Sequence, residues 1–166
     1  MKKLRWEYLK RALDLLVIVS IIFAGIQLSN SWKVDSAKFI YEIGKDLNNN
    51  AFDKITSAID DNKSTFKLLK PDGEFSPNDI ETYLNGYDFV GNLNNDNLVD
   101  MRLAYDEFSY DVEKAFCNND IRQHIRDLRS KDKDKTGPNS FYWGFTTLAE
   151  QFLKRDNKTC VDLDKQ

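Results

Sequence analysis

The side chains that most often catalyse reactions or bind metals are scarce in this chain. It has one histidine, His124, and two cysteines, Cys117 and Cys160, which lie 43 positions apart without a C-x-x-C motif. A zinc site needs about four Cys, His or acidic ligands, and a catalytic nucleophile needs a base beside it. The sequence therefore predicts no metal site, no cofactor and no catalytic residue.

The two cysteines leave two alternatives open. They are either two free or buried thiols, which is the simpler interpretation, or a disulfide between Cys117 and Cys160. A disulfide requires that this part of the chain lies outside the cytoplasm, because the cytosol keeps thiols reduced.

Acidic side chains flank one apolar helix face in a segment rich in aromatic residues. They are Asp106, Glu107, Asp111 and Glu113. General acid–base catalysis needs carboxylates that point into a cleft and have shifted pKa values. The helical spacing instead points these four outward, so we expect them to keep the domain soluble.

A basic stripe is the candidate binding surface. Arg122, Arg126 and Arg129 recur at steps of four and three residues, so a helix places them on one face. That face would suit anionic headgroups or an acidic protein partner. Asp127 and neighbouring acids favour the alternative that the stripe is simply solvated. His124 lies beside the stripe without a recognisable nucleophile partner.

The elements that must position these residues begin with the one long apolar run, residues 13–28. A membrane-spanning helix needs about 20 residues, so this run is marginal alone. Tryptophans flank it where an aromatic belt would lie, and Asp14 falls one turn from basic residues with which it can pair. We therefore expect a basic leader at 1–12 and a signal anchor at 13–30, in preference to a cleaved signal or a buried core helix.

Charge sets the expected orientation and excludes one class of partner. Residues 1–14 hold five basic and two acidic residues, so of the chain's 24 basic and 27 acidic residues the remainder holds 19 and 25. An acidic body lacks the basic surface that nucleic-acid binding needs. The more basic side of a membrane segment stays in the cytoplasm. We expect a single-pass protein of a bacterial inner membrane, with a cytoplasmic amino end and a periplasmic carboxyl-terminal domain.

Beyond the anchor, apolar residues recur at three- and four-residue steps and no strand pattern stands out. This spacing predicts helices over residues 34–47, 52–59, 76–91, 96–116, 120–129 and 140–152. The predicted fold is all-α: one N-terminal transmembrane helix that continues into a compact bundle of about five to six helices. The helical domain is expected at 31–155 and a polar tail at 156–166.

Capping residues mark three of the expected helix starts. Ser76, followed by Pro77, predicts the start of one helix. Asp96 or Asn97 is expected to cap the next helix, and Ser140 the last. In the helix expected over residues 96–116, the inward face is expected to begin at Leu98.

The order of these segments resembles one bacterial family. A basic start and one apolar segment lead into "AKFIYEIGKDLNNNAFDKI", then "DIETYLNGYDFVGNL", an acid- and aromatic-rich helix, "NNDIRQHIRDLR" and a late "FYWGFTTLAEQF". This layout is similar to uncharacterised bacterial membrane-anchored proteins grouped as domain of unknown function 4760, over most of residues 30–153. The resemblance implies an anchored helical domain and brings no catalytic residues.

The expected function is that of a single-pass membrane-anchored protein-interaction, sensor or accessory module without catalysis. Its expected partners are the lipid bilayer, through the N-terminal helix, and a protein partner or a second copy of the chain. Two alternatives stay open: a membrane-anchored enzyme with an unrecognised site, and a phage-defence or stress effector at the membrane.

Overall fold

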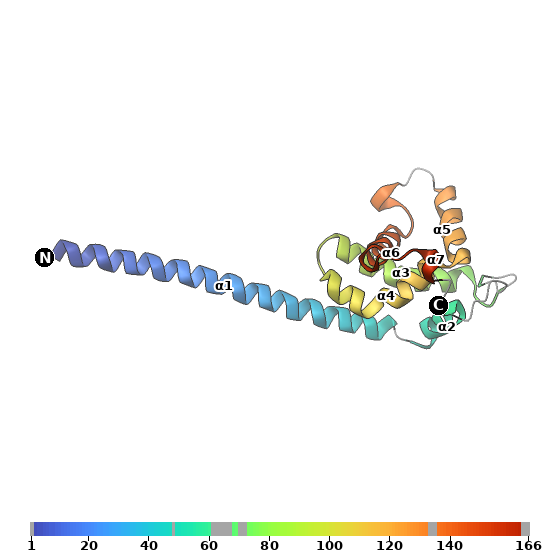
Figure 1. The fold of residues 1–166 in the computed structure, drawn as a ribbon, viewed down its shortest axis with the longest axis horizontal. Coiled ribbons are helices and arrows are strands. Elements are labelled where there is room, and N and C mark those ends of the chain that lie inside the picture. The colour runs from blue at the N-terminus through green and yellow to red at the C-terminus, as the bar shows by residue number, and fades with distance from the viewer. Residues whose placement is uncertain (1, 48, 61–67, 70–72, 133–135, 164–166) are drawn as a thin grey trace. The chain divides into compact units, whose positions relative to one another are not determined.

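A computed structural model gives the fold, which is built from α-helices (Figure 1). It describes residues 2–47, 49–60, 68–69, 73–132 and 136–163, and side chains from residue 16 to residue 161 within these ranges. The helices are α1 (Lys2–Leu47), α2 (Asn50–Asp60), α3 (Pro77–Asn95), α4 (Met101–Cys117), α5 (Asn119–Lys131), the 3-10 turn η1 (Gly137–Asn139), α6 (Trp143–Asp156) and α7 (Cys160–Leu163). The described ranges contain no strand beyond one isolated bridge between Leu69 and Phe75. The all-α prediction is confirmed.

The chain divides into two units, residues 1–38 and residues 39–166. The first unit is the greater part of α1, whose side chains from residue 16 to residue 35 are all exposed. Within the described residues, one helix is long and apolar enough to cross a membrane, and that stretch lies in Leu16–Leu47. This agrees with the predicted apolar N-terminal helix. The expected pairing of Asp14 lies outside the described side chains.

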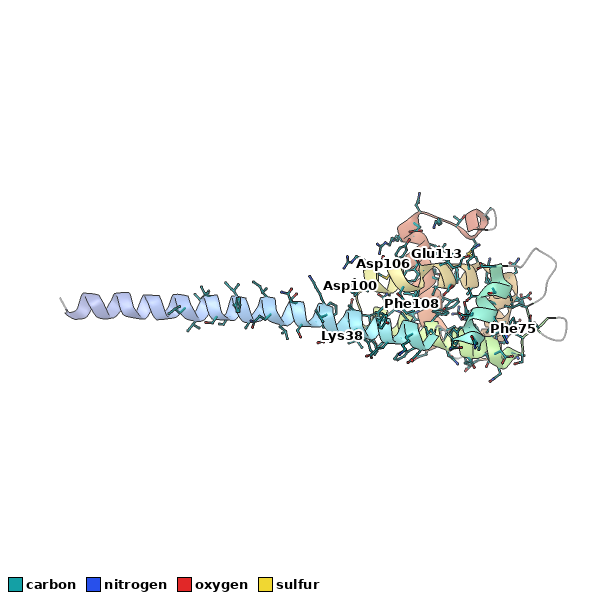
Figure 2. The ribbon with its side chains drawn as sticks, turned by 90° about the horizontal axis from the view of Figure 1, so that it is seen from below. Lys38, Phe75, Asp100, Asp106, Phe108 and Glu113 are labelled. Atoms are coloured by element: carbon teal, nitrogen blue, oxygen red, sulfur yellow. A yellow bond between two sulfur atoms is a disulfide. The ribbon has the colours of Figure 1, made fainter. Side chains whose placement is uncertain are left out.

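The second unit packs its helices around an apolar core. Helices α3 and α6 form its most extensive contact, and α4 packs against both. Its largest fully buried side chains include Tyr83, Leu84, Phe145 and Phe152. Figure 2 shows the side chains filling the space between these helices, with Phe108 of α4 among them. The predicted helical bundle is confirmed.

Two glycines explain why α3 and α6 lie so close together. A Cβ atom on Gly91 would fall 2.0 Å from the backbone oxygen of Gly144, and one on Gly144 would fall 2.3 Å from the backbone oxygen of Asp88. Only a residue without a Cβ allows such an approach. The prediction that this helix ends near Gly91 is therefore wrong. The residue serves packing, and α3 continues to Asn95.

The first capping prediction is confirmed and the second is wrong. The Ser76 hydroxyl accepts the backbone N–H of Asp79, and the Asp79 carboxylate accepts the backbone N–H of Ser76 at 2.8 Å. This reciprocal capping box satisfies two donors at the start of α3. Helix α4, however, is capped by Asp100, whose side chain accepts the N–H of Arg102 at 2.8 Å.

The reason for the later start of α4 is the turn before it. Asn97 takes a left-handed φ of 57°, and the N–H of Leu98 reaches back to the carbonyl oxygen of Leu93 at 2.8 Å. These residues therefore close the end of α3 and do not begin α4. Leu98 is 57% exposed, which corrects its expected place on the inward face.

Helix α6 also begins later than the expected cap at Ser140. Tyr142 has a left-handed φ of 53°, and the helix starts at Trp143. A left-handed conformation in a bulky residue costs roughly 1–3 kcal/mol. Burial of the Tyr142 ring in the core offsets this cost.

The segment expected as a polar tail from residue 156 contains α7. This short helix packs against α4. It is joined to that helix through Cys160 and Cys117. The segment has too few apolar residues to predict this contact from its sequence. A disulfide, and not an apolar helix face, attaches it to α4.

Candidate functional site

The second unit contains a cavity of about 360 Å³ that we call the acidic cleft. Four elements line it: the last turns of α1, then α2, α3 and α4. Its aromatic lining consists of Phe52, Tyr87 and Phe108, and its acidic lining of Asp53, Glu107 and Asp111. No single stretch of sequence contains this site, since its walls come from segments more than fifty positions apart.

The aromatic lining is held by edge-to-face contacts. The ring centroids of Phe52 and Tyr87 lie 6.1 Å apart and those of Tyr87 and Phe108 lie 6.0 Å apart. Such edge-to-face pairs are a favoured geometry and fix the orientation of each ring. The Tyr83 hydroxyl, also in the core, lies 3.3 Å from Oγ1 of Thr56 on α2. Contacts among α2, α3 and α4 therefore hold the lining in place.

Asp111 is the innermost acid of the cleft. Its Oδ2 accepts a hydrogen bond from the Tyr87 hydroxyl at 3.1 Å. Burial raises the pKa of the Asp111 carboxyl, and repulsion from Asp60 and Asp53 raises it further, whereas the Tyr87 hydrogen bond lowers it. The prediction that Asp111 points away from any cleft is wrong, because α2 and the end of α1 cover this side of α4.

The acids around the cleft form no ion pairs with the basic side chains that the structure describes. Within the part of the chain that the structure describes, no ion pair reaches Asp53, Asp60, Glu107 or Asp111. Asp60 accepts a hydrogen bond from the Tyr110 hydroxyl at 2.9 Å. The cleft thus concentrates negative charge beside a partly enclosed, aromatic surface.

Glycines make room for the cleft. A Cβ on Gly44 would fall 2.5 Å from Oε1 of Glu107, so the missing side chain leaves space for that carboxylate. A Cβ on Gly86 would fall 2.5 Å from Cδ2 of Leu47 and 3.3 Å from the Phe52 ring. Gly86 therefore lets Leu47 of α1 and Phe52 of α2, two lining residues of the cleft, pack against α3.

The basic stripe expected as a binding surface is divided by the fold. Arg129 is partly buried and donates from Nε to the carbonyl oxygen of Phe141 at 2.8 Å and from Nη2 to that of Tyr142 at 3.2 Å. Burial lowers the pKa of its guanidinium. Arg129 therefore clamps the left-handed turn before α6, while Arg122 and Arg126 remain exposed.

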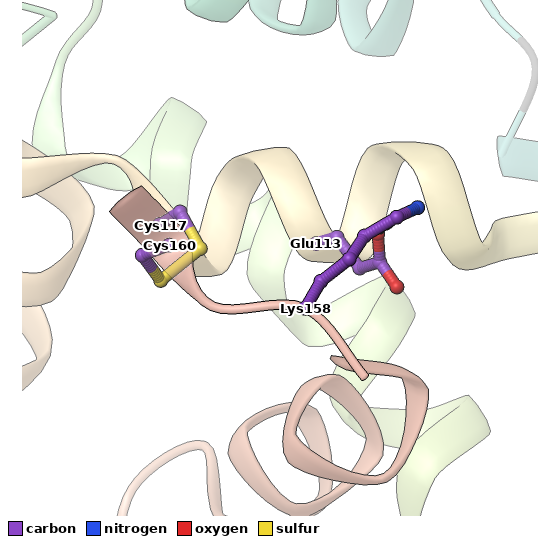
Figure 3. Close-up of a disulfide and its surroundings, with 4 residues drawn as sticks. All are labelled: Glu113, Cys117, Lys158 and Cys160. Atoms are coloured by element: carbon purple, nitrogen blue, oxygen red, sulfur yellow. A yellow bond between two sulfur atoms is a disulfide. The ribbon is translucent and has the colours of Figure 1, made fainter. Parts of the chain in front are cut away.

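Cys117 and Cys160 form a disulfide with an S–S distance of 2.04 Å (Figure 3). This is the second of the two alternatives that the sequence leaves open. Lys158, two residues before Cys160, donates from its Nζ to Oδ2 of Asp156 at 2.5 Å and lies 3.9 Å from Oε2 of Glu113. We call this group of four residues, all labelled in Figure 3, the disulfide corner.

Glu113 was expected to point outward, and that prediction is wrong. Only 4% of the residue is exposed, and burial raises the pKa of its carboxyl while Lys158 lowers it. Its Oε1 has no hydrogen-bond partner. Lys158, which follows α6, lies beside Glu113, and a local helical pattern cannot predict this contact between segments 45 positions apart. Asp106 is exposed as expected.

His124 is part of no recognisable catalytic group. Its Nε2 lies 3.2 Å from Oε1 of Glu81 on α3, without hydrogen-bond geometry. Among the described residues, no three His, Cys, Asp or Glu side chains are grouped so that they could hold a metal ion.

The sequence offers one weak signal of the cleft that its analysis missed. Glu107 and Asp111 lie one helical turn apart on either side of Phe108. This spacing places two carboxylates beside a core-facing ring on one edge of the helix. The covering elements, however, are not visible in a local pattern.

Comparisons with known proteins add no relative from which a role can be transferred. No family model, no curated protein and no solved structure matches this chain. The resemblance to the bacterial membrane-anchored family therefore stays a prediction, and any function must be argued from the chain's own residues.

Proposed function

We propose that this chain is a single-pass membrane-anchored binding module whose ligand site is the acidic cleft. The observation that carries the proposal is the cleft itself: a cavity lined by aromatic residues and by carboxylates that form no ion pair within the described residues. Concave sites with apolar walls and a few convergent polar groups are the usual place of small-ligand binding. This makes the protein a sensor or accessory module in preference to a catalyst.

The anchoring half of the proposal rests on α1. Its exposed large apolar side chains include Leu16, Ile18, Ile22, Phe23 and Leu28. Such a surface is unfavourable in water and favourable in lipid. The basic residues before it support a cytoplasmic amino end. The disulfide supports an extracytoplasmic second unit, in keeping with the bacterial inner membrane that the family resemblance implies.

Membrane attachment is tested by alkaline carbonate extraction of the full chain. We expect the unaltered protein to stay in the membrane pellet and the double variant Ile18→Lys/Ile22→Lys to be released, because two lysines at the centre of a span are costly. The matched control is Asn30→Lys/Ser31→Lys, which adds the same charge to the same helix and should stay in the pellet. Release of the unaltered protein would contradict the anchor.

Orientation is tested separately by an alkaline phosphatase fused after Gln166. Phosphatase activity is expected, because the enzyme needs an oxidising compartment to form its own disulfides. An inactive phosphatase, with a fluorescent cytoplasmic reporter at the same position, would reverse the proposed topology.

Binding at the cleft is tested by nuclear magnetic resonance of the full chain in nonionic detergent. A set of small fragments of positive, neutral and negative charge is titrated while the backbone amides are monitored. We expect saturable shifts that concentrate at Gly44, Thr56 and Ser57, which line the cleft. Fragments that shift only amides elsewhere, or none at all, would contradict the proposed site.

A further inference from the structure

We propose that the acidic cleft binds a primary ammonium group carried on an unbranched alkyl chain. This inference rests on the proposed function and names the ligand class of the same site. The ammonium would lie among the cleft carboxylates, and its alkyl chain would lie along the aromatic wall. Free alkyl amines and lysine side chains share this chemistry.

The charge of the cleft is not balanced by any basic side chain that the structure describes. Carboxylates enter it from α2 through Asp53 and from α4 through Glu107 and Asp111. Asp60 adds its charge from the end of α2, where it is close enough to affect Asp111. No described basic side chain forms an ion pair with any of the four. A bound ammonium would remove the mutual repulsion of these groups.

The aromatic wall favours an organic cation over a metal ion. A bare metal ion needs several oxygen, nitrogen or sulfur ligands at close distances. The described residues contain no group of three acidic, His or Cys side chains that meets this need. Phe52 and Leu47, which line the cleft and are partly exposed, offer apolar surface that packs against methylene groups, and the Phe52 ring also attracts an ammonium. Tyr87 and Phe108 are almost fully buried and support Phe52 from the core.

The size of the cleft limits the ligand to one chain. A cavity of about 360 Å³ lies at the low end of the range of small-molecule sites. It admits an extended amine or one inserted side chain and excludes a folded partner. Leu47, beside the aromatic rings, provides further apolar surface for the alkyl part.

The first experiment compares three probes of equal length. Full-length protein labelled with ¹⁵N in nonionic detergent is titrated with butylammonium, with 1-butanol and with butyrate. We expect saturable shifts of the Gly44, Thr56 and Ser57 amides with butylammonium, and binding at least about tenfold weaker for the neutral and anionic probes. The amides of the exposed residues Ser130 and Lys154 serve as internal controls and should not move.

The outcomes separate the ligand class from the site. If 1-butanol or butyrate shifts the cleft amides as strongly as butylammonium, the cleft stands as a site and the ammonium proposal is overturned. If no probe shifts the cleft amides at any concentration, both the ligand class and the proposed function are overturned.

The second experiment removes one charge at a time. Glu107→Gln and Asp111→Asn keep the side-chain shape and should each weaken butylammonium binding by about tenfold. Asp106→Asn is the matched control, because Asp106 is exposed on the same helix outside the cleft lining. Thermal melting of each variant shows whether the domain is still folded. Unchanged affinity in both cleft variants would overturn the proposal.

Two further probes distinguish the source of the ammonium. A free diamine, 1,5-diaminopentane, represents a soluble amine, and N-acetyl-lysine methylamide represents a side chain presented by a partner. Tighter binding of the diamine supports a soluble amine, and tighter binding of the lysine derivative supports an inserted lysine. Failure of both to compete with butylammonium would overturn the proposal, since each carries the same group.

Discussion

Helix α4 sends carboxylates to two regions that balance their charge differently. At the disulfide corner, Glu113 is almost fully buried and the ammonium of Lys158 lies 3.9 Å from its Oε2. In the acidic cleft, Asp111 accepts the Tyr87 hydroxyl but meets no cation within the described part of the chain. Burial raises the pKa of both carboxyl groups, so both are costly to ionise.

The difference shows how one helix serves structure at one end and recognition at the other. The corner has a cation of its own, because the Lys158 ammonium pairs with Asp156 and also lies near Glu113, two residues from the cross-linked Cys160. The cleft keeps its charge unbalanced beside a cavity, which costs stability when the site is empty. An unbalanced charge next to open space is what a site for an external cation requires.

Opening the disulfide corner should have the largest effect. The bridge spans 43 positions, so the double variant Cys117→Ser/Cys160→Ser should lower the free energy of unfolding by about 2–4 kcal/mol. Urea denaturation followed by near-ultraviolet circular dichroism measures the change. A dithiol should bring the unaltered protein to the same midpoint and leave the variant unaffected. Equal midpoints for all samples would mean that the bridge adds no stability.

Removing the cation of the corner should have the next largest effect. Lys158→Met removes the cation from both Asp156 and the buried Glu113, and we expect a loss of about 1–2 kcal/mol, limited because Lys158 is partly exposed. The loss should shrink as the pH falls, because protonation removes the unpaired charge. Lys114→Met, on the same side of α4, is the control and should change stability less. Adding Glu113→Gln to Lys158→Met should recover the part of the loss that comes from the buried Glu113 and leave the part that comes from Asp156.

Neutralising the cleft should stabilise the empty protein. Because the pKa of Asp111 is raised above the ordinary 3.8, the folded state binds more protons than the unfolded state. Stability from this group is therefore present at low pH and is lost as the pH rises through the raised pKa. At pH 7 we expect Asp111→Asn to raise the free energy of unfolding by about 0.5 kcal/mol, measured as a higher melting temperature. At pH 3 we expect the variant and the unaltered protein to have the same melting temperature. Asp106→Asn should show no such pH-dependent gain.

Adding a methyl group at the cleft should have the smallest effect on stability of the four changes, and a larger effect on ligand binding than on stability. In Gly44→Ala the added Cβ displaces the end of the flexible Glu107 side chain, and better helix propensity offsets the crowding. We expect the melting temperature to change little and butylammonium affinity to fall by about threefold, because the carboxylate is moved. A large drop in melting temperature would show that Gly44 serves packing, as Gly91 does, and not the site.

The all-α class and several helices follow from local patterns. Apolar residues at three- and four-residue steps predict helices, and the Ser76 capping box predicts the start of α3, because both signals act within a few residues. The predictions are wrong where a contact between distant segments determines the local structure. Gly91 reads locally as a helix end, but the helix continues because the residue packs against Gly144.

The candidate site was beyond the reach of such patterns. The sequence predicts that Arg129 is one of three equivalent surface arginines. In the structure Arg129 donates hydrogen bonds to the carbonyl oxygens of Phe141 and Tyr142, just before α6. The local pattern predicts that Asp111 and Glu113 are exposed, but α2 lies beside Asp111 and Lys158 lies beside Glu113. In each case the local spacing places the residue correctly on its helix and says nothing about what lies opposite.

By itself, the sequence determined the helical class, the apolar N-terminal helix, the acidic body and the cysteine pair that a disulfide can join. These depend on composition and on neighbours within one or two turns. Only the tertiary structure decided that Phe52, Tyr87 and Asp111 enclose one cleft and that Glu113 is sealed beside Lys158. The physical reason is that burial and charge balance depend on the whole surroundings of a side chain, and folding assembles those surroundings from distant segments.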